Sequence, residues 1–207
     1  LVQRGELGRV YAVDLTFHNA YGPDKPWFYD PALSGGGCVI DLGIHLVDLA
    51  LWTLGWPAVE GAHARLFSKG RPLGSAGDAV EDYAVATLDL AGGAAVRLAC
   101  SWHLSAGTDA VIEAAFYGDG SGGGAGGAAF RNVGGSFYDF EAVRFRGTAR
   151  EPLAPAGQGG SEAWGGRAAV AWAERLAASK AFDPEAERAV VVAEVLDRIY
   201  GRQNDGR

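Results

Sequence analysis

Short alternating segments separated by glycine turns constrain the fold of this chain more than any other feature of its sequence. The segment Val10–His18 alternates in polarity, as expected of a strand with one buried face. Further candidate strands occupy residues 61–67, 81–90, 94–102, 110–117, 128–132 and 136–146. Ala91-Gly92-Gly93 lies between two of them and predicts a β-hairpin. Because no helices alternate regularly with these strands, we expect a largely antiparallel sheet.

Helices are predicted near the two ends of the chain. The long apolar run Cys38–Leu54 is closed by Gly55 and Pro57, which are helix stop signals. Two more helices are expected over residues 162–179 and 184–201. Asp183 is a suitable N-cap for the last helix, and Pro184 suits its first position. Three segments rich in turn formers predict loops: residues 19–34, 68–79 and 149–160.

These elements indicate an α+β fold, an open, largely antiparallel sheet with helices on one face, as a single domain over residues 1–207. Hydrophobic residues at 48% and charged residues at 21% are ordinary for a folded domain. The net charge of −7 disfavours nucleic acid or an anionic membrane as a partner. We see no apolar run near the roughly 20 residues of a membrane span. Cys38 and Cys100 lie in apolar runs, so we expect reduced, buried thiols in a cytoplasmic protein.

The helix predicted over Cys38–Leu54 carries an unexpected polar stripe. At about 100° per residue, four of its side chains fall within roughly 60° of one another. These are Asp41, His45, Asp48 and Trp52. Burying a carboxylate without partners costs several kcal/mol. Either the stripe therefore faces a cavity, or its groups satisfy one another and nearby backbone.

Two interpretations of the stripe remain open. In the structural one, Asp41 and His45 form a buried pair that braces the helix against a loop. In the functional one, neutral His45 accepts a proton while Asp41 orients the ring and stabilises its charged form. Gly35-Gly36-Gly37, just before the helix, lets another chain segment or a ligand approach closely. Asp48 lies one turn further from the helix start, and we interpret it as structural or as a supporting residue behind the pair.

The segment Ser34–Leu49 resembles the Gly-Gly-x-x-x-Asp-x-Gly-x-His-x-x-Asp segment of the glucose–fructose oxidoreductase / inositol dehydrogenase (Gfo/Idh/MocA) family. Other parts follow in the same order. Gly5–Val10 resembles the opening of that family's C-terminal domain, residues 81–102 its central hairpin, and residues 164–200 its closing helices. The resemblance covers essentially the whole chain, and the segment from Asp41 to His45 is fairly specific.

The resemblance implies the C-terminal catalytic domain of an NAD(P)-dependent oxidoreductase that acts on a secondary alcohol of a sugar, inositol or related polyol. The residue matching His45 is commonly the base that removes the hydroxyl proton, and the one matching Asp41 positions that base or the substrate. A lysine of a Glu-Lys-Pro motif, in the preceding Rossmann domain, completes the set. Asp24-Lys25-Pro26 imitates the motif on the wrong side of the domain boundary, so that role is not assigned to Lys25.

The chain has no Met and begins at Leu1, so we expect it to be a piece of a longer protein whose Rossmann domain is absent. Such a piece alone should bind no NAD or NADP and should be inactive. We expect a homodimer or tetramer through the sheet face that the helices leave open. The alternative is a non-enzymatic binding or oligomerisation module that retains the scaffold.

Other motifs carry less weight. Gly118-Asp-Gly-Ser-Gly-Gly123 matches G-x-G-x-x-G, but more glycines follow where a dinucleotide site needs a helix, so a glycine-rich hairpin turn is the better interpretation. No His or Cys pair has an established zinc spacing, and no G-x-S-x-G elbow indicates a hydrolase.

Four aromatic residues are candidate substrate-binding walls, because aromatic faces with a polar handle suit polyols. They are Trp27, Tyr29, Trp102 and His103. Ordinary packing of the sheet against the helix is the alternative for each of them. Glu81 and Asp82 begin a strand, and we expect them to form only a solvated edge.

Overall fold

The computed structural model describes residues 1–74, 79–121, 123, 126–153, 166–179 and 181–202. Nine strands form one open sheet in the order β3-β2-β4-β5-β1-β6-β7-β8-β9. The strands are β1 (Val10–Asn19), β2 (Val59–Ser68), β3 (Arg71–Pro72), β4 (Tyr83–Leu90), β5 (Ala95–Ser101), β6 (Ala110–Gly118), β7 (Gly127–Asn132), β8 (Phe140–Arg146) and β9 (Ala149–Leu153). The α+β class and the open sheet are as the sequence predicts.

Antiparallel pairing dominates the sheet, with one exception at its centre. Every neighbouring pair among the described strands is antiparallel except β1 and β5, which run parallel. Leu15 of β1 lies opposite Leu98 of β5 on one side and Ala114 of β6 on the other. The predicted hairpin is confirmed as β4 and β5, and the glycine-rich stretch joins β6 to β7.

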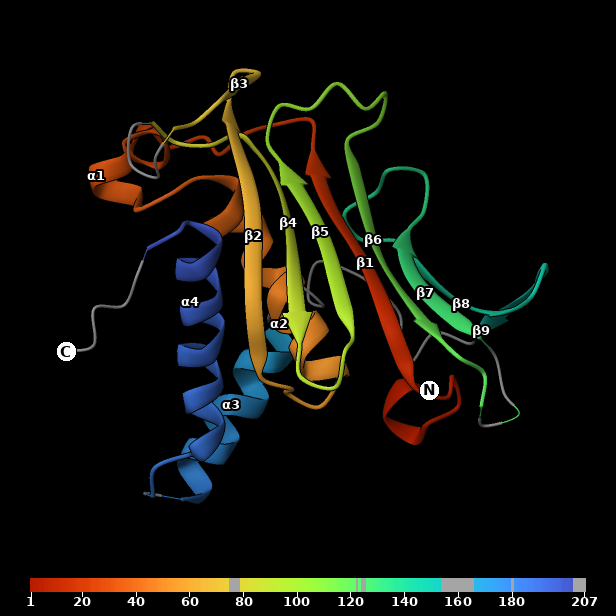
Figure 1. The fold of residues 1–207 in the computed structure, drawn as a ribbon. Helices are drawn as coiled ribbons and strands as arrows, with labels where there is room; N and C mark the ends of the chain where they lie inside the picture. Colours follow the sequence, from red (N-terminus) through yellow and green to blue (C-terminus); the bar gives the residue numbers. More distant parts are fainter. Residues whose placement is uncertain (75–78, 122, 124–125, 154–165, 180, 203–207) are drawn as a thin grey trace.

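The helices gather on one side of the sheet (Figure 1). They are α1 (Pro31–Ser34), α2 (Ile44–Thr53), α3 (Gly166–Ala178) and α4 (Glu187–Ile199), with a π-helical turn at Val39–Gly43 and short 3₁₀ turns at Val2–Arg4, Pro26–Tyr29 and Pro184–Ala186. The Asp183 side chain accepts from the N–H of Glu185 and Pro184 opens the 3₁₀ turn that leads into α4, so that helix start is confirmed. Residues 162–165 and 203–207 lie outside the described residues.

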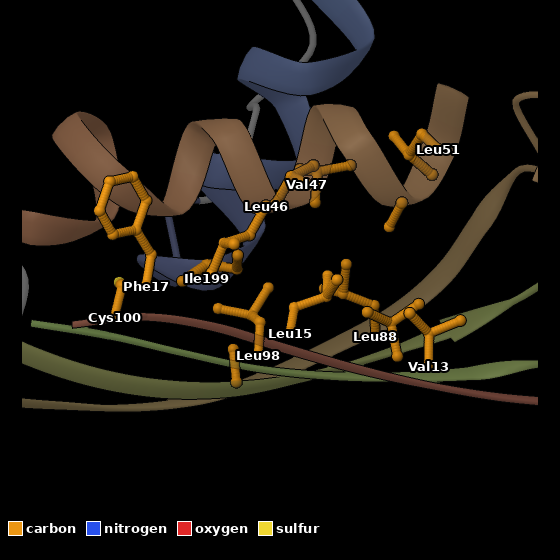
Figure 2. Close-up of a cluster of buried hydrophobic side chains, with 14 of the residues drawn as sticks. Val13, Leu15, Phe17, Leu46, Val47, Leu51, Leu88, Leu98, Cys100 and Ile199 are labelled. Atoms are coloured by element: carbon orange, nitrogen blue, oxygen red, sulfur yellow. The ribbon is translucent and has the colours of Figure 1, made fainter. Parts of the chain in front are cut away.

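The main core lies between α2, α4 and the central strands (Figure 2). Leu46, Val47 and Leu51 point from α2 toward the sheet. They meet side chains that are almost completely buried: Val13, Leu15, Leu88 and Leu98. Ile199 of α4 closes the cluster from the side. Full burial of a Leu or Val stabilises a fold by about 1.5–3 kcal/mol, which fixes α2 on the sheet.

All three predicted loops contain structure that the sequence does not indicate, and within residues 68–79 it is the short strand β3. Residues 149–153 form the edge strand β9 instead of the start of a linker, while 154–160 lie outside the described residues. β9 pairs with β8 through its backbone, and the Arg144–Glu151 and Arg150–Glu141 ion pairs join the two strands. Its side chains are nearly all exposed, so no hydrophobic pattern marks it. The loop after β1 likewise includes a 3₁₀ turn and α1.

The segment from α1 through the π-helical turn to α2 is longer than the helix that the sequence predicts, and it is strongly apolar. Pro31–Thr53 spans 23 residues, with a mean hydropathy of 1.4 in its most apolar window, so by length and composition alone it is able to cross a membrane. Core helices of soluble proteins meet the same criterion. Here α2 packs on the sheet through Leu46, Val47 and Leu51, which is the arrangement of a core helix.

Candidate active site

The candidate site lies at the sheet edge where β1 and β5 end. The two strands run parallel, with His18 opposite Ser101, so their carboxyl ends lie at the same edge. The segments that leave them are joined there, since the N–H of His103 donates to the carbonyl of Tyr21 at 3.3 Å. Two segments distant in sequence therefore meet beside the helix start that carries Asp41.

Asp41 is fixed by the tryptophan that directly follows β5 and not by its helix neighbour His45. The indole N–H of Trp102 donates to Oδ2 of Asp41 at 2.9 Å, and Trp102 is only 3% exposed. Asp41 itself is half-buried and lies in the π-helical turn Val39–Gly43. Such turns are rare and occur frequently at functional sites. The carboxylate thus has a defined position at the base of the site.

His45 stands one helical turn after Asp41 and is exposed. No hydrogen bond joins these two side chains in the described part of the chain, and the His45 ring lies 6.3 Å from that of Phe17. A buried Asp–His pair is therefore not what holds the helix. Asp48 and Trp52 are also exposed, so the polar stripe faces outward, away from the core. Although Asp48 is exposed, partial burial of its carboxyl raises the pKa of Asp48, and the charge of His45 opposes this shift.

The four predicted wall residues come together in one aromatic group. The Tyr29 hydroxyl lies 3.1 Å from Nε2 of His103, and the Tyr29 ring packs edge-on against Trp102 with ring centres 5.7 Å apart. Trp27 joins through Phe28, on which it stacks at 3.8 Å and which also contacts Trp102. Partial burial and then the charge of Asp41 raise the pKa of Tyr29. Phe28 is the member of this group that the sequence analysis does not single out.

A hollow of about 550 Å³ lies beside this group. Its walls are Phe67, Lys69, Gly70, Asp82, Tyr83, Trp102, His103 and Leu104. Trp102 and His103 therefore border both the hollow and the aromatic group. Asp41 and His45 do not line the hollow, and His45 instead faces solvent.

The prediction that Glu81 forms part of a solvated edge is wrong, because Glu81 is buried. The residue is 1% exposed, and its Oε1 accepts from the N–H groups of Gly37 and Val39 at 2.8 and 3.0 Å. The hydroxyl of Tyr200 donates to the same oxygen at 2.6 Å. The glycines before the helix are the one sequence signal of this contact, since they admit a close neighbour.

The remaining candidates lie elsewhere or are inert. Lys25 forms an exposed ion pair with Asp24 at 2.8 Å. Cys38 and Cys100 are buried free thiols with sulfurs 3.8 Å apart, and burial raises the pKa of Cys38. Among the residues that the structure describes, no group of three His, Cys, Asp or Glu side chains is placed to hold a metal ion.

Comparison with known proteins shows the same scaffold. A family model described as the GFO/IDH/MocA C-terminal domain matches residues 1–121, more than half of the 207 residues. D-glucoside 3-dehydrogenase of Escherichia coli K12 is 31% identical over an alignment of 131 residues, which covers 58% of this chain and 37% of that relative.

Solved structures of oxidoreductases match nearly the whole chain. GenD2 from gentamicin A biosynthesis, in complex with NAD, is 26% identical with a TM-score of 0.65, over 99% of this chain and 56% of that one. Aldose–aldose oxidoreductase from Caulobacter crescentus, complexed with glycerol, is 20% identical with a TM-score of 0.72, over 100% and 57%. Levoglucosan dehydrogenase, with NADH and L-sorbose, is 17% identical with a TM-score of 0.72, over 97% and 58%. The chain thus spans little more than half the length of these proteins.

Proposed function

Since this chain belongs to the GFO/IDH/MocA family of oxidoreductases, we propose that it is the catalytic, substrate-binding and oligomerisation domain of an NAD(P)-dependent enzyme. The substrate would be a secondary alcohol of a sugar, inositol or related polyol. The relatives of this chain include a glucoside dehydrogenase, which supports a sugar-like substrate. The exposed aromatic rings of Trp27 and Tyr29 suit the apolar faces of such a substrate, with Trp102 packed behind Tyr29.

One observation carries this proposal: Asp41 is held at the base of the site while His45, one turn away, is open to a ligand. His45 would take the hydroxyl proton of the substrate as the carbon loses its hydride, so that the alcohol becomes a ketone. The carboxylate of Asp41 would stabilise the resulting imidazolium through space and help to orient the substrate hydroxyl.

The nicotinamide cofactor, when bound, supplies the acceptor for the hydride. The residues of this chain fit the substrate side of that reaction: a proton acceptor, a carboxylate and aromatic walls. The glycine-rich stretch after β6 leads into β7 and not into a helix, so it does not have the strand–helix form of a pyrophosphate site. We therefore propose that the cofactor is held outside this chain, and that the 207 residues alone do not turn over.

The test is the activity of the full-length protein that carries this chain, against a panel of sugars and polyols with NAD and with NADP. The His45→Ala change should lower kcat by about 10²–10⁴-fold, the usual contribution of a general base. The Asp41→Asn change should lower kcat less, because it removes charge but leaves an acceptor for Trp102. The Glu194→Gln change, at an exposed position of α4, is the matched control.

Two results would contradict the proposal. Turnover of His45→Ala at the wild-type rate would remove the base from the mechanism. Micromolar binding of NAD or NADP to the isolated 207 residues, measured by calorimetry, would contradict the placement of the cofactor.

We also propose a homodimer or tetramer through the sheet face opposite the helices. A hollow of about 500 Å³ lies on that face. Its polar lining consists of Asp14, Thr16, His63, Arg65, Thr87 and Arg97. Val85→Arg, at the middle of this face, should dissociate the oligomer in sedimentation velocity, whereas Val190→Arg on the exposed side of α4 should not. A protein that is monomeric before any change would overturn this part of the proposal.

A further inference from the structure

The buried carboxylate of Glu81 and the helix start that carries Asp41 are joined in a closed ring of contacts. We infer that Glu81 is a positioning residue, which sets the place of Asp41 and His45 without touching substrate. The inference deepens the proposed function and rests on it for its kinetic test. Its structural test is independent of turnover.

The first arm of the ring runs from the Glu81 side chain to the helix. A helix start leaves its first N–H groups without intrahelical partners. Here Oε1 of Glu81 accepts from the N–H groups of Gly37 and Val39, and the Glu81 carbonyl accepts from that of Cys38 at 3.0 Å. Three successive backbone donors at the helix start therefore end on one residue of a different element.

The close approach of Glu81 depends on two glycines. A Cβ added at Gly37 would overlap the carbonyl oxygen of Glu81. A Cβ added at Gly36 would overlap the hydroxyl of Tyr200, which donates to the same carboxylate. The glycines, the buried acid and the end of α4 thus form one unit, and a change in any of them moves the helix start.

The second arm of the ring runs from Asp82, the residue after Glu81, to the Asp41 side chain. The carbonyl of Asp82 accepts from the N–H of Trp102 at 2.8 Å, and the indole of Trp102 donates to Asp41 at 2.9 Å. Asp82 is itself held, because its carboxylate accepts from the N–H of Lys69 at 2.8 Å. Glu81 therefore holds the backbone just before Asp41, and Asp82 holds the Trp102 that binds the Asp41 side chain.

This geometry separates positioning from general stability. Leu51 and its neighbours already attach α2 to the sheet over its whole length, so loss of the Glu81 contacts should loosen the first turn and not unfold the helix. A displacement of about 1 Å at a reacting group is enough to lower a rate by roughly 10²-fold. Asp41 lies in the π-helical turn that these contacts hold, and His45 lies in the first turn of α2 after it.

The test uses the full-length protein and four variants. Glu81→Leu removes the acceptor at similar volume, Glu81→Gln keeps an acceptor oxygen and removes the charge, and Tyr200→Phe removes one donor. Glu141→Gln, on β8, is the control: it also removes the charge of a hydrogen-bonded Glu but lies far from the helix. Hydrogen exchange of peptides covering residues 36–48 is measured together with kcat and KM.

Glu81→Leu should raise exchange in residues 36–48 about tenfold, the factor for roughly one lost hydrogen bond, and leave exchange in β6–β8 unchanged. It should lower kcat about 100-fold with little change in the cofactor KM. Glu81→Gln should restore both properties to near wild type. Tyr200→Phe should show the same pattern at smaller amplitude, which keeps the test valid if Glu81→Leu does not fold.

Unchanged exchange in residues 36–48 for both Glu81→Leu and Tyr200→Phe would overturn the inference. So would a loss of kcat in Glu81→Gln as large as in Glu81→Leu, because the acceptor would then not be what matters. If the wild-type protein turns over no member of the panel, the proposed function fails, and the exchange result still decides whether Glu81 holds the helix start.

Discussion

The half of the sheet beneath the helices and the wing formed by β7, β8 and β9 are held together by different forces. Under α2 and α4, completely buried apolar side chains such as Leu51, Leu88 and Leu98 form a continuous core. In the wing, Ala129 of β7 and Val143 of β8 join Ala115 of the neighbouring strand β6 in a small cluster that is separate from the main core. Ion pairs join the wing strands: Arg131–Glu141, Arg150–Glu141 and Arg144–Glu151.

The comparison explains where the candidate site lies. The proposed function requires fixed positions for Asp41 and His45, and apolar burial attaches α2 and the π-helical turn before it to the sheet. Exposed ion pairs contribute little because water and salt screen them. The wing is therefore the part of the described sheet with more freedom to adjust, and the site is built on the other part.

The largest effect on the free energy of unfolding is expected in the half of the sheet beneath the helices, the covered half. Leu98→Ala, at the centre of β5, should lower the free energy of unfolding by about 2–5 kcal/mol. The substitution leaves a cavity, and the packing of α2 on the sheet keeps that cavity from collapsing. Urea unfolding with a constant m-value measures this loss. A loss below that of Val143→Ala would break the comparison.

Val143→Ala, measured by the same urea unfolding, tests how much the apolar cluster stabilises the wing. Val143 is completely buried, and removal of two methylene equivalents at ~0.8 kcal/mol each predicts a loss of about 1.6 kcal/mol. Val133→Ala, at an exposed position after β7, is the control and should be neutral. A loss as large as that of Leu98→Ala would show that the wing is as rigid as the covered half.

The ion pairs of the wing should contribute less to the free energy of unfolding than its apolar cluster does. Arg144 contacts Glu151 at 2.7 Å and Glu6 at 3.4 Å, and Arg144→Gln removes both contacts. The resulting loss should be smaller than that of Val143→Ala and should disappear at about 1 M salt, where screening is nearly complete. A salt-independent loss would indicate packing by the arginine stem.

The smallest effect on stability is expected for His18 on β1, in the middle of the sheet. His18 stacks on Tyr83 and lies 2.7 Å from the hydroxyl of Ser101, and burial lowers its pKa. The folded protein thus favours neutral His18, so stability is complete above the unfolded pKa of about 6.5 and falls as the pH drops toward the lower folded pKa. His18→Asn should remove this part of the pH dependence. Urea unfolding at a series of pH values measures it, and a stability that rises toward acid pH would contradict the sign.

Much of the fold follows from local patterns in the sequence. Val10–His18 alternates with a period of two, Ala91-Gly92-Gly93 permits a tight turn, and Cys38–Leu54 is apolar with stop signals. Each of these is a property of neighbouring residues, and each predicts the element that the structure contains. β9 escapes such reasoning, because an exposed edge strand held by its partner has no pattern of its own.

The candidate site was only partly predictable for the same reason. Asp41 and His45 stand out because two ionisable groups on an apolar helix are unusual, and the wall residues stand out as aromatic groups near it. That Asp41 binds Trp102, 61 residues away, depends on the parallel pairing of β1 and β5. Pairing between distant strands is not encoded in any one segment.

The sequence by itself determined the periodicities, the turns and the helix that bears the polar stripe, since these depend on contacts between residues close in the chain. Only the tertiary structure decided which polar groups are buried. Glu81 and Tyr200 are 119 residues apart and meet at the helix start. A carboxylate is stable in the interior only where distant elements bring donors to it, so its burial is a property of the whole fold.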